Sequence, residues 1–367
     1  MSAPTVPAST FARRLDVLRS ELPAEGLDGL LLSKLSNVRY LSGFTGSSGR
    51  LLMLPERSVL FTDFRYEEQA SDEVDPVIEV RISRNGLLED VAAFLDERGL
   101  SGRLGFEPES VTVRDRHELG ELCDRVTWET APTWVEAQRV RKDPQEIEAI
   151  ESAARIGEAA LQEVLTSVAE GVTERTLAAE LDYQLRLAGS GPAAFETIVA
   201  AGPRSALPHA QPSDRTLLKG DLVLFDFGAT VGGYCSDMTR TFVLGAAADW
   251  QRELHQAVAA AQEAAIAVIA AGVAARDVDG AAREVLRAAG MAERFGHGTG
   301  HGIGLEVHEA PRIHRRSEDA LEAGSVVTVE PGVYLPGRGG VRIEDDVVVE
   351  EAGARTLTRY SRDLIEL

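Results

Sequence analysis

Residues 296–309 read GHGTGHGIGLEVHE, a run that holds three of the seven histidines of the chain together with five glycines. Histidine supplies a neutral nitrogen ligand for a metal ion, or carries a proton near neutral pH. Glycine allows the backbone to bend tightly and to approach a ligand closely. The combination indicates a metal site or an acid–base site, and the rest of the chain must supply its other groups.

The totals describe a globular protein with more than one domain. A chain of 367 residues exceeds one ordinary domain, so two domains are expected. The net charge of −21 argues against a nucleic-acid or anionic-membrane partner, because both require a basic surface. Cys123 and Cys235 lie far apart, and residues 1–10 lack the basic and apolar regions of a signal peptide. We therefore expect a cytoplasmic protein without disulfides or a membrane segment, with a disordered tail over residues 1–10.

The first part of the chain alternates helical and strand patterns. Apolar stripes and capping signals predict helices over residues 11–23, 63–70, 87–98 and 113–122. Short apolar runs predict strands at residues 27–32, 51–54, 58–62, 77–80 and 104–106. This alternation predicts an α/β domain with a largely buried sheet over residues 11–135. It holds no concentration of chemically active side chains.

A helix-start signal marks the boundary to a second domain. Asp143 stands at the N-cap position and Pro144 at the first helical position, so residues 136–147 form a linker and helix start. Residues 148–367 contain an internal repeat. One segment begins at Gly171 and ends in LRLAG, and a second begins at Gly272 and ends in LRAAG. Duplicated halves commonly pack about a pseudo-two-fold axis, so a shared site is expected between them.

Each half supplies a pair of carboxylates. Asp226 ends the apolar run before Gly228, and Asp237 follows; Glu330 ends a second apolar run, and Glu344 follows. A carboxylate in an apolar strand is costly to bury unless it is paired or bound to a metal. Four acids and one histidine provide the ligands of two divalent cations. This oxygen-rich set suits Mn²⁺ best, with Co²⁺, Fe²⁺ or Zn²⁺ as alternatives.

Each motif taken alone also has a structural interpretation. A lone Asp226 is more often a turn-capping residue, Asp237 alone would pair with Arg240, and Glu344 with the two aspartates after it would form a solvated acidic turn. His255, in an amphipathic helical pattern, is interpreted as structural or exposed. The same holds for His314, which lies in a basic patch with Arg312, Arg315 and Arg316.

Five motifs together resemble the pita-bread metallopeptidases, in the Xaa-Pro branch that contains aminopeptidase P and prolidase. They are Pro208-His209, DFG at 226–228, SDMTRT at 236–241, the histidine–glycine run to Glu309, and EPG at 330–332 with RIED at 342–345. One motif alone is weak, but five in the same order and spacing are specific. The resemblance covers essentially the whole chain. It implies a creatinase-like N-terminal α/β domain, followed by a pita-bread domain whose pseudo-two-fold symmetric halves form a curved antiparallel sheet with flanking helices.

The resemblance implies a role for each motif residue. The implied metal ligands are Asp226, Asp237, His301, Glu330 and Glu344, with Asp237 and Glu344 bridging two ions. Glu330 also resembles the general base for the metal-bound water. His308 resembles the group that stabilises the oxyanion, and His209 the one beside the scissile peptide. His297 corresponds to the proline-side pocket, and Arg342 to the arginine that holds nearby carboxylates.

The implied reaction is attack by a metal-bridging hydroxide on the Xaa-Pro bond at the N-terminus of a peptide. FETIVAAG at 195–202 and HGT at 297–299 favour an aminopeptidase P-like enzyme. Prolidase, which cleaves only dipeptides, is the alternative, because a steric stop against longer peptides cannot be seen in sequence. A metal-free creatinase-like hydrolase or a binding module on this fold is disfavoured by the intact ligand positions. Relatives are often dimers, so we expect a homodimer that acts on proline-containing peptides.

Overall fold

The computed structural model describes residues 8–367, and the chain divides between Arg139 and Val140 into two compact units. Residues 1–7 of the tail expected over residues 1–10 lie outside the described residues. The first helix, α1 (Ala8–Glu25), already includes residues 8–10. Thr10 and Phe11 are buried, so this first turn is packed, which explains why it is ordered as helix.

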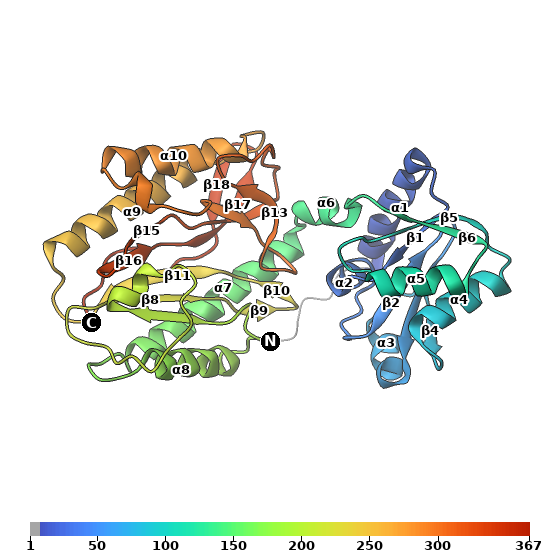
Figure 1. The fold of residues 1–367 in the computed structure, drawn as a ribbon, viewed down its shortest axis with the longest axis horizontal. Coiled ribbons are helices and arrows are strands. Elements are labelled where there is room, and N and C mark those ends of the chain that lie inside the picture. Colours follow the sequence, from blue (N-terminus) through green and yellow to red (C-terminus); the bar gives the residue numbers. More distant parts are fainter. Residues whose placement is uncertain (1–7) are drawn as a thin grey trace. The chain divides into compact units, whose positions relative to one another are not determined.

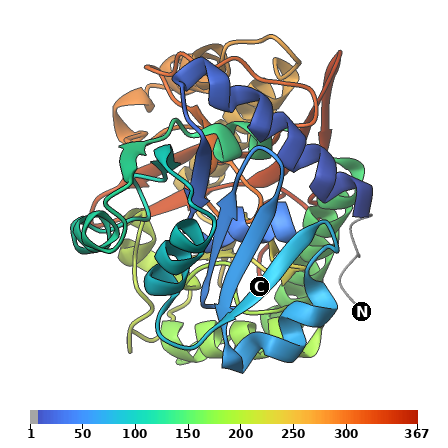
Figure 2. The same cartoon turned by 90° about the vertical axis from the view of Figure 1, so that its right-hand side faces the viewer.

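The N-terminal unit is built on one six-stranded sheet with the order β4-β3-β2-β1-β5-β6 (Figures 1 and 2). β2 pairs antiparallel with both neighbours, and the remaining pairs are parallel. Its strands are β1 (Gly29–Leu32), β2 (Gly49–Met53), β3 (Ser58–Asp63), β4 (Ile78–Ser83), β5 (Gly102–Phe106) and β6 (Val126–Thr130). Its other helices are α2 (Leu35–Ser42), η1 (Phe64–Tyr66), α3 (Glu67–Glu73), α4 (Leu87–Glu97) and α5 (Val113–Leu122), and α6 (Trp134–Val140) reaches the unit boundary. The predicted α/β class is confirmed.

Two local expectations for this unit need correction. The helix expected over residues 63–70 begins only at Glu67, because the Asp63 side chain accepts a hydrogen bond from the Arg65 amide and caps a short 3-10 turn first. Strand β6 was not expected, because three of its five residues are polar. It lies at the edge of the sheet, where only Val126 and Trp128 are buried.

The C-terminal unit places antiparallel strands between two pairs of helices. In Figure 1, α9 (Asp249–Ala267) and α10 (Ala275–Ala288) lie on one side of the strands, and α7 (Pro144–Leu165) and α8 (Glu174–Leu187) on the other. The predicted helix start is confirmed: the Asp143 side chain accepts hydrogen bonds from the amides of Gln145 and Glu146. Within residues 8–367, no helix has the length and apolar character that crossing a membrane requires.

Each half of this unit contributes its own antiparallel sheet. The first half forms β11-β8-β7, and the second forms β13-β12-β14-β17-β18. The bounds in the first half are β7 (Ile198–Ala201), η2 (Gly202–Ala206), β8 (Leu222–Phe227), β9 (Thr230–Val231), β10 (Tyr234–Cys235) and β11 (Met238–Val243). Those in the second are η3 (Ala292–Arg294), β12 (Gly300–Gly302), β13 (Glu309–Ile313), β14 (Val326–Val329), β15 (Gly332–Leu335), β16 (Gly339–Arg342), β17 (Asp345–Glu350) and β18 (Gly353–Thr356).

The repeat is visible in the backbone. Gly171 and Gly272 have φ angles of 89° and 84°, in the left-handed region that favours glycine. The Gly171 amide donates to Leu217 O at 2.9 Å, and the Gly272 amide donates to Leu321 O at 2.8 Å. Equivalent glycines therefore begin equivalent segments, which supports the duplication inferred from sequence.

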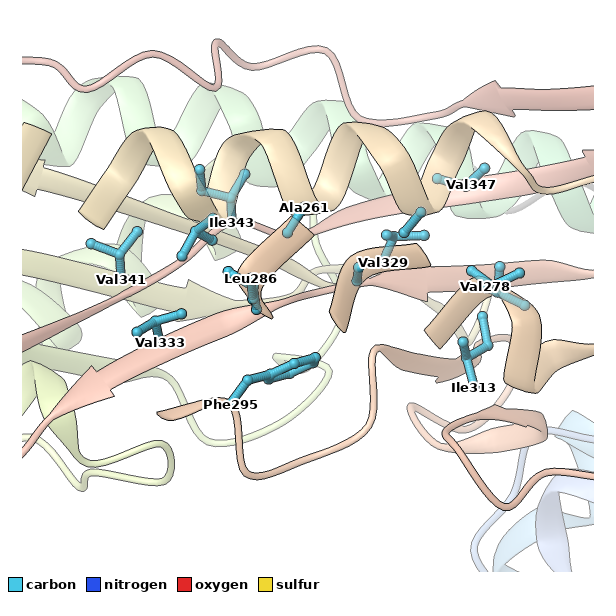
Figure 3. Close-up of a cluster of buried hydrophobic side chains, with 14 of the residues drawn as sticks. Ala261, Val278, Leu286, Phe295, Ile313, Val329, Val333, Val341, Ile343 and Val347 are labelled. Atoms are coloured by element: carbon cyan, nitrogen blue, oxygen red, sulfur yellow. The ribbon is translucent and has the colours of Figure 1, made fainter. Parts of the chain in front are cut away.

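Each half also buries its own apolar core. One core packs α7 and α8 against β8 and β11. The other packs α9 and α10 against β14–β17, with Val278, Leu286 and Val329 among its members (Figure 3). The halves meet where β11 contacts the second sheet: the Glu344 amide donates to Thr239 O at 3.1 Å. The strand ends of both halves therefore converge at this junction.

Candidate metal centre

The four predicted carboxylates lie at the strand ends where the two halves meet. Asp226 lies in β8 and opposes Thr239 of β11, and Asp237 precedes β11. Glu330 directly follows β14, and Glu344 directly precedes β17. His301 lies at the centre of β12, the neighbour of β14. The apolar strands thus deliver one acid at the end of an outgoing strand and one before the returning strand in each half.

These side chains approach one another closely. One ligand atom each of Asp237, His301 and Glu344 lies within 4.8 Å of the others. His301 Nε2 lies 3.5 Å from Glu330 Oε1 and 3.7 Å from Asp237 Oδ2. A cavity of about 510 Å³ brings together every residue predicted for the site: His209, Asp226, Asp237, His297, His301, His308, Glu330, Arg342 and Glu344.

His301 presents a free nitrogen to the carboxylates. Its Nδ1 lies 3.0 Å from the carbonyl oxygen of Gly302. A carbonyl oxygen only accepts hydrogen bonds, so Nδ1 carries the proton and Nε2 keeps its lone pair. Burial lowers the pKa of His301 to about 4, which keeps the ring neutral. Such a ring, oriented by a backbone carbonyl, is the form in which histidine binds metals.

The candidate carboxylates are buried close to one another, and a cation would stabilise their charged forms. Burial, followed by repulsion from neighbouring acids, raises the pKa of Asp237 and Glu344, and burial raises the pKa of Glu330 to about 7. Asp226 Oδ1 and Asp237 Oδ1 are buried without a hydrogen-bond partner among residues 8–367. Buried carboxylate oxygens without partners are costly. Carboxylate oxygens with one imidazole nitrogen suit hard or borderline divalent cations, so these residues fit such ions.

Arg342 holds the candidate ligand Asp226, which is not part of the close group of Asp237, His301 and Glu344. Its Nη2 donates to Asp226 Oδ2, and its Nε donates to Thr239 Oγ1 at 3.0 Å. Thr239 Oγ1 donates in turn to Glu344 Oε2 at 2.6 Å. The arginine therefore connects ligands from both halves.

Tyr334 is a site residue that sequence reasoning missed. Its hydroxyl accepts from Arg342 Nη1 at 2.8 Å and lies 2.9 Å from His297 Nε2. His297 Nδ1 donates to Gly298 O at 2.7 Å, so Nε2 accepts the tyrosine proton. Tyr334 thus links the first histidine of the run to the ligand cluster. No sequence signal marked Tyr334, because it lies among the apolar residues of β15, although it follows the Glu330 motif closely.

The structural interpretations of Asp237 and Glu344 are wrong. Arg240 pairs with Asp345 at 2.7 Å, not with Asp237. Glu344, Asp345 and Asp346 are at most 2% exposed, so they form no solvated turn. Instead Asp346 Oδ2 accepts a hydrogen bond from the Asp237 amide at 3.0 Å. In this acidic run, Glu344 therefore lines the cavity, and Asp345 and Asp346 bind residues of β11 and the residue before it.

Arg312 and His314 also line the cavity, whereas the sequence analysis assigned both to a basic patch and gave neither a role in the site. Arg312 opposes His301 in the register of β12 and β13, so both side chains share one face of the sheet. Arg312 is exposed and forms no ion pair with the residues that the structure describes. Strand register was the signal that could have found it. A free cation therefore lies beside the candidate metal ligands.

Comparison with protein families agrees with this arrangement. The family model described as metallopeptidase family M24 matches residues 148–351, and the one described as the creatinase/prolidase N-terminal domain matches residues 14–141. An Xaa-Pro dipeptidase of Pyrococcus furiosus is 34% identical over 96% of this chain and 99% of that protein.

Solved structures of similar proteins include both an Xaa-Pro dipeptidase and an X-Pro aminopeptidase. An Xaa-Pro dipeptidase from Bacillus anthracis superimposes with a TM-score of 0.94 at 39% identity, covering 97% of this chain and 100% of that one. An X-Pro aminopeptidase from Thermotoga maritima superimposes with a TM-score of 0.88 at 38% identity, covering 93% and 98%. Both substrate classes are therefore represented at nearly equal identity.

Proposed function

Because the chain belongs to metallopeptidase family M24 and is therefore a peptidase, we propose that it hydrolyses Xaa-Pro dipeptides, as a prolidase does. This departs from the aminopeptidase P-like activity favoured by the sequence motifs. The observation that carries the proposal is Arg312, a cation in the cavity beside His301 with no acidic partner in the described chain. The free carboxylate of a dipeptide would pair with it.

Two divalent cations, Mn²⁺ first among them, are the proposed cofactors. The residues that would hold them are Asp226, Asp237, His301, Glu330 and Glu344. When bound, such ions lower the pKa of a coordinated water and polarise the carbonyl that it attacks. The unpartnered oxygens of Asp226 and Asp237 support this assignment, because each has a lone pair directed at no protein donor.

The remaining residues handle the substrate and its protons. Glu330 lies within the cluster and takes the proton of the attacking water. His308, whose ring lies 4.3 Å from that of His301, donates a hydrogen bond to the developing oxyanion. His209 lies at the scissile peptide, and His297, oriented by Tyr334, lines the proline side. Arg342 keeps Asp226 and Tyr334 in place.

Substrate length tests the proposal. We expect faster hydrolysis of Met-Pro than of Met-Pro-Pro, because only the dipeptide brings its carboxylate to Arg312. Arg312→Met should raise KM for Met-Pro by about tenfold or more, the cost of losing a charge-assisted pair. The matched control is Arg315→Met, since Arg315 lies outside the cavity. A clear preference for Met-Pro-Pro would instead establish aminopeptidase P activity, the second candidate.

We further propose that the protein is cytoplasmic and that it is, as the resemblance implies, a homodimer. The homodimer proposal rests on that resemblance. Its measurement is the molar mass in solution by light scattering, where the mass of one chain, 39.5 kDa, would refute it.

A further inference from the structure

Glu309, the residue after His308, forms a buried ion pair with Lys142. Lys142 Nζ lies 3.1 Å from Glu309 Oε2, and the two side chains are 2% and 6% exposed. An ion pair removed from water is stable only when its geometry is good and further hydrogen bonds satisfy it. Here Lys142 Nζ also donates to Val140 O, and Glu309 Oε1 accepts from the Glu306 amide at 3.0 Å. Both carboxylate oxygens are therefore engaged.

The backbone before Glu309 is wrapped around this carboxylate. Residues 303–308 connect β12 to β13 without regular structure. A Cβ on Gly304 would lie 2.7 Å from Glu309 Oε1 and 2.9 Å from Oε2, so only glycine allows the carboxylate this position. The Gly304 amide donates to Glu306 O at 3.0 Å, and Gly304 O accepts from the Cys235 amide at 2.8 Å. The Glu309 carboxylate thus lies inside the loop, against Gly304 and the Glu306 amide.

His308 depends on this loop for its position. The imidazole is exposed, and none of its nitrogens forms a hydrogen bond with residues 8–367. Its ring contact is with His301, at a centroid distance of 4.3 Å. Because the side chain has no polar anchor of its own, the backbone of residues 304–309 sets where the ring lies.

The lysine is itself fixed in space. The Lys142 amide donates to Gly324 O at 2.9 Å, and the next residue, Asp143, caps α7. The ammonium therefore approaches Glu309 from a rigid segment. This arrangement ties the start of α7 to the loop that carries His308.

We propose that Lys142 and Glu309 are positioning residues for His308, and this rests on the proposed function, in which His308 stabilises the oxyanion. Neither side chain is among the residues that line the cavity. Lys142 holds the Glu309 carboxylate in place, and the carboxylate holds the loop closed through the Glu306 amide.

Kinetics of Lys142→Met and Glu309→Gln test the proposal. Misplacing a catalytic group by about 1 Å can cost on the order of 100-fold in rate, so we expect kcat to fall at least about tenfold. KM and bound metal should stay within about twofold, because neither the substrate pocket nor the ligands lose a contact. The matched control is the exposed pair formed by Arg141 and Glu322, at 3.8 Å, whose variants Arg141→Met and Glu322→Gln should leave kcat unchanged.

The double variant K142M/E309Q separates positioning from stability. It leaves no unpaired buried charge, so its melting temperature should recover towards that of the wild type. Its kcat should stay low, because the charged anchor of the loop is still missing. A kcat that recovers together with the melting temperature would overturn the proposal, as would a kcat restored to wild type by saturating Mn²⁺.

Hydrogen exchange of the protein as purified, with its metal content unchanged, provides a readout that does not depend on activity. Amides of residues 304–308 should exchange at least about tenfold faster in Glu309→Gln than in the wild type, while amides of α10 stay unchanged. Unchanged exchange in this loop would contradict the proposal. A wild type that cleaves no Xaa-Pro substrate would contradict the proposed function, and the exchange result would still decide whether Glu309 holds the loop.

Discussion

His297 and His301 are the same residue type in the same glycine-rich run, yet their surroundings assign them different tasks. Each donates from Nδ1 to the carbonyl of the following glycine, at 2.7 Å and 3.0 Å. Each therefore offers Nε2 as an acceptor. The Nε2 of His301 faces two carboxylates, and that of His297 faces the Tyr334 hydroxyl. What separates the two is the group opposite Nε2, which comes from distant strands.

Tyr334→Phe tests the link between His297 and the ligand cluster. The change removes the acceptor of an Arg342 proton and the donor to His297, leaving one buried and one partly buried polar atom without that partner. We expect a loss of stability of about 1–3 kcal/mol. We also expect a fall in kcat/KM of about tenfold, because the proline-side histidine loses its orientation. Chemical denaturation and steady-state kinetics on Met-Pro measure both. Wild-type kcat/KM in the variant would show that His297 needs no tyrosine.

His255 makes a prediction about pH. It is buried in α9, and burial lowers its pKa to about 4, with Asp363 opposing this shift and Arg240 adding to it. The unfolded chain binds a proton at this ring near the ordinary histidine pKa of 6.5, whereas the folded chain does not until about pH 4. The contribution of the neutral His255 ring to the free energy of unfolding is therefore fully present above pH 6.5. This contribution is lost as the pH falls from 6.5 towards 4.

Between pH 7 and pH 5 the loss should be about 2 kcal/mol. His255→Leu should reduce the difference between the unfolding free energies at these two pH values by that amount. His117→Leu is the control, because the His117 side chain is 74% exposed. Equal pH dependence in the wild type and His255→Leu would rule out His255 as the cause.

At the scale of elements, the sequence predicted those parts whose local pattern is strong. The apolar runs ending at Asp226 and Glu330 indicated β8 and β14, and the Asp143-Pro144 signal placed the start of α7. Edge strand β6 was missed because only one of its faces is buried. The position of Arg312 opposite His301 was missed because it follows from the pairing of β12 with β13, which single-strand patterns do not contain.

Helix α10 fixes the turn that carries His297. Arg283 on this helix donates from Nη1 to Phe295 O at 3.0 Å and from Nη2 to His297 O. Its Nε pairs with Asp279, which is fully buried and also accepts from Thr299 Oγ1 at 2.9 Å. The Glu330 amide donates to Thr299 O at 2.8 Å. The helix thus supports both a histidine and a candidate ligand.

Arg283→Met should leave the Asp279 carboxylate without its buried partner and release the turn. Breaking a buried pair costs about 3 kcal/mol, and we expect kcat to fall about tenfold as His297 moves. Arg287→Met on the same helix is the matched control, since Arg287 and its partner Glu284 are both more than 60% exposed. Such surface pairs contribute at most about 1 kcal/mol. Equal effects of the two substitutions would argue against a special role for Arg283.

At the scale of the whole molecule, the site belongs to neither half of the catalytic unit alone. The helix pair of each half covers a different apolar core, and Leu222 and Val243 of the first half belong to the second core. Each half supplies two of the four carboxylates. The repeat allowed this shared site to be expected from the sequence. The contacts that join the halves could not be expected, because Arg342 reaches Asp226 and Thr239 across more than 100 positions of the chain.

Metal removal should therefore loosen the C-terminal unit and spare the N-terminal one. Without cations, the buried carboxylates at the junction repel one another, whereas the core of the N-terminal sheet contains no candidate ligand. Adding Mn²⁺ to chelator-treated protein at about 100 times its Kd stabilises the folded state by about 2.7 kcal/mol. That corresponds to a rise of roughly 5–10 °C in the melting temperature of a unit of this size.

Differential scanning calorimetry with and without chelator measures this shift, and activity on Met-Pro should disappear and return with it. Hydrogen exchange assigns the transition, because strands β8, β11, β14 and β17 should lose protection without metal while β1, β2 and β3 keep theirs. The control is Asp237→Asn, which removes a proposed bridging charge and should show little Mn²⁺-dependent shift. If the wild type keeps full activity in excess chelator, or if both units respond equally to Mn²⁺, cations do not join the two halves at this site.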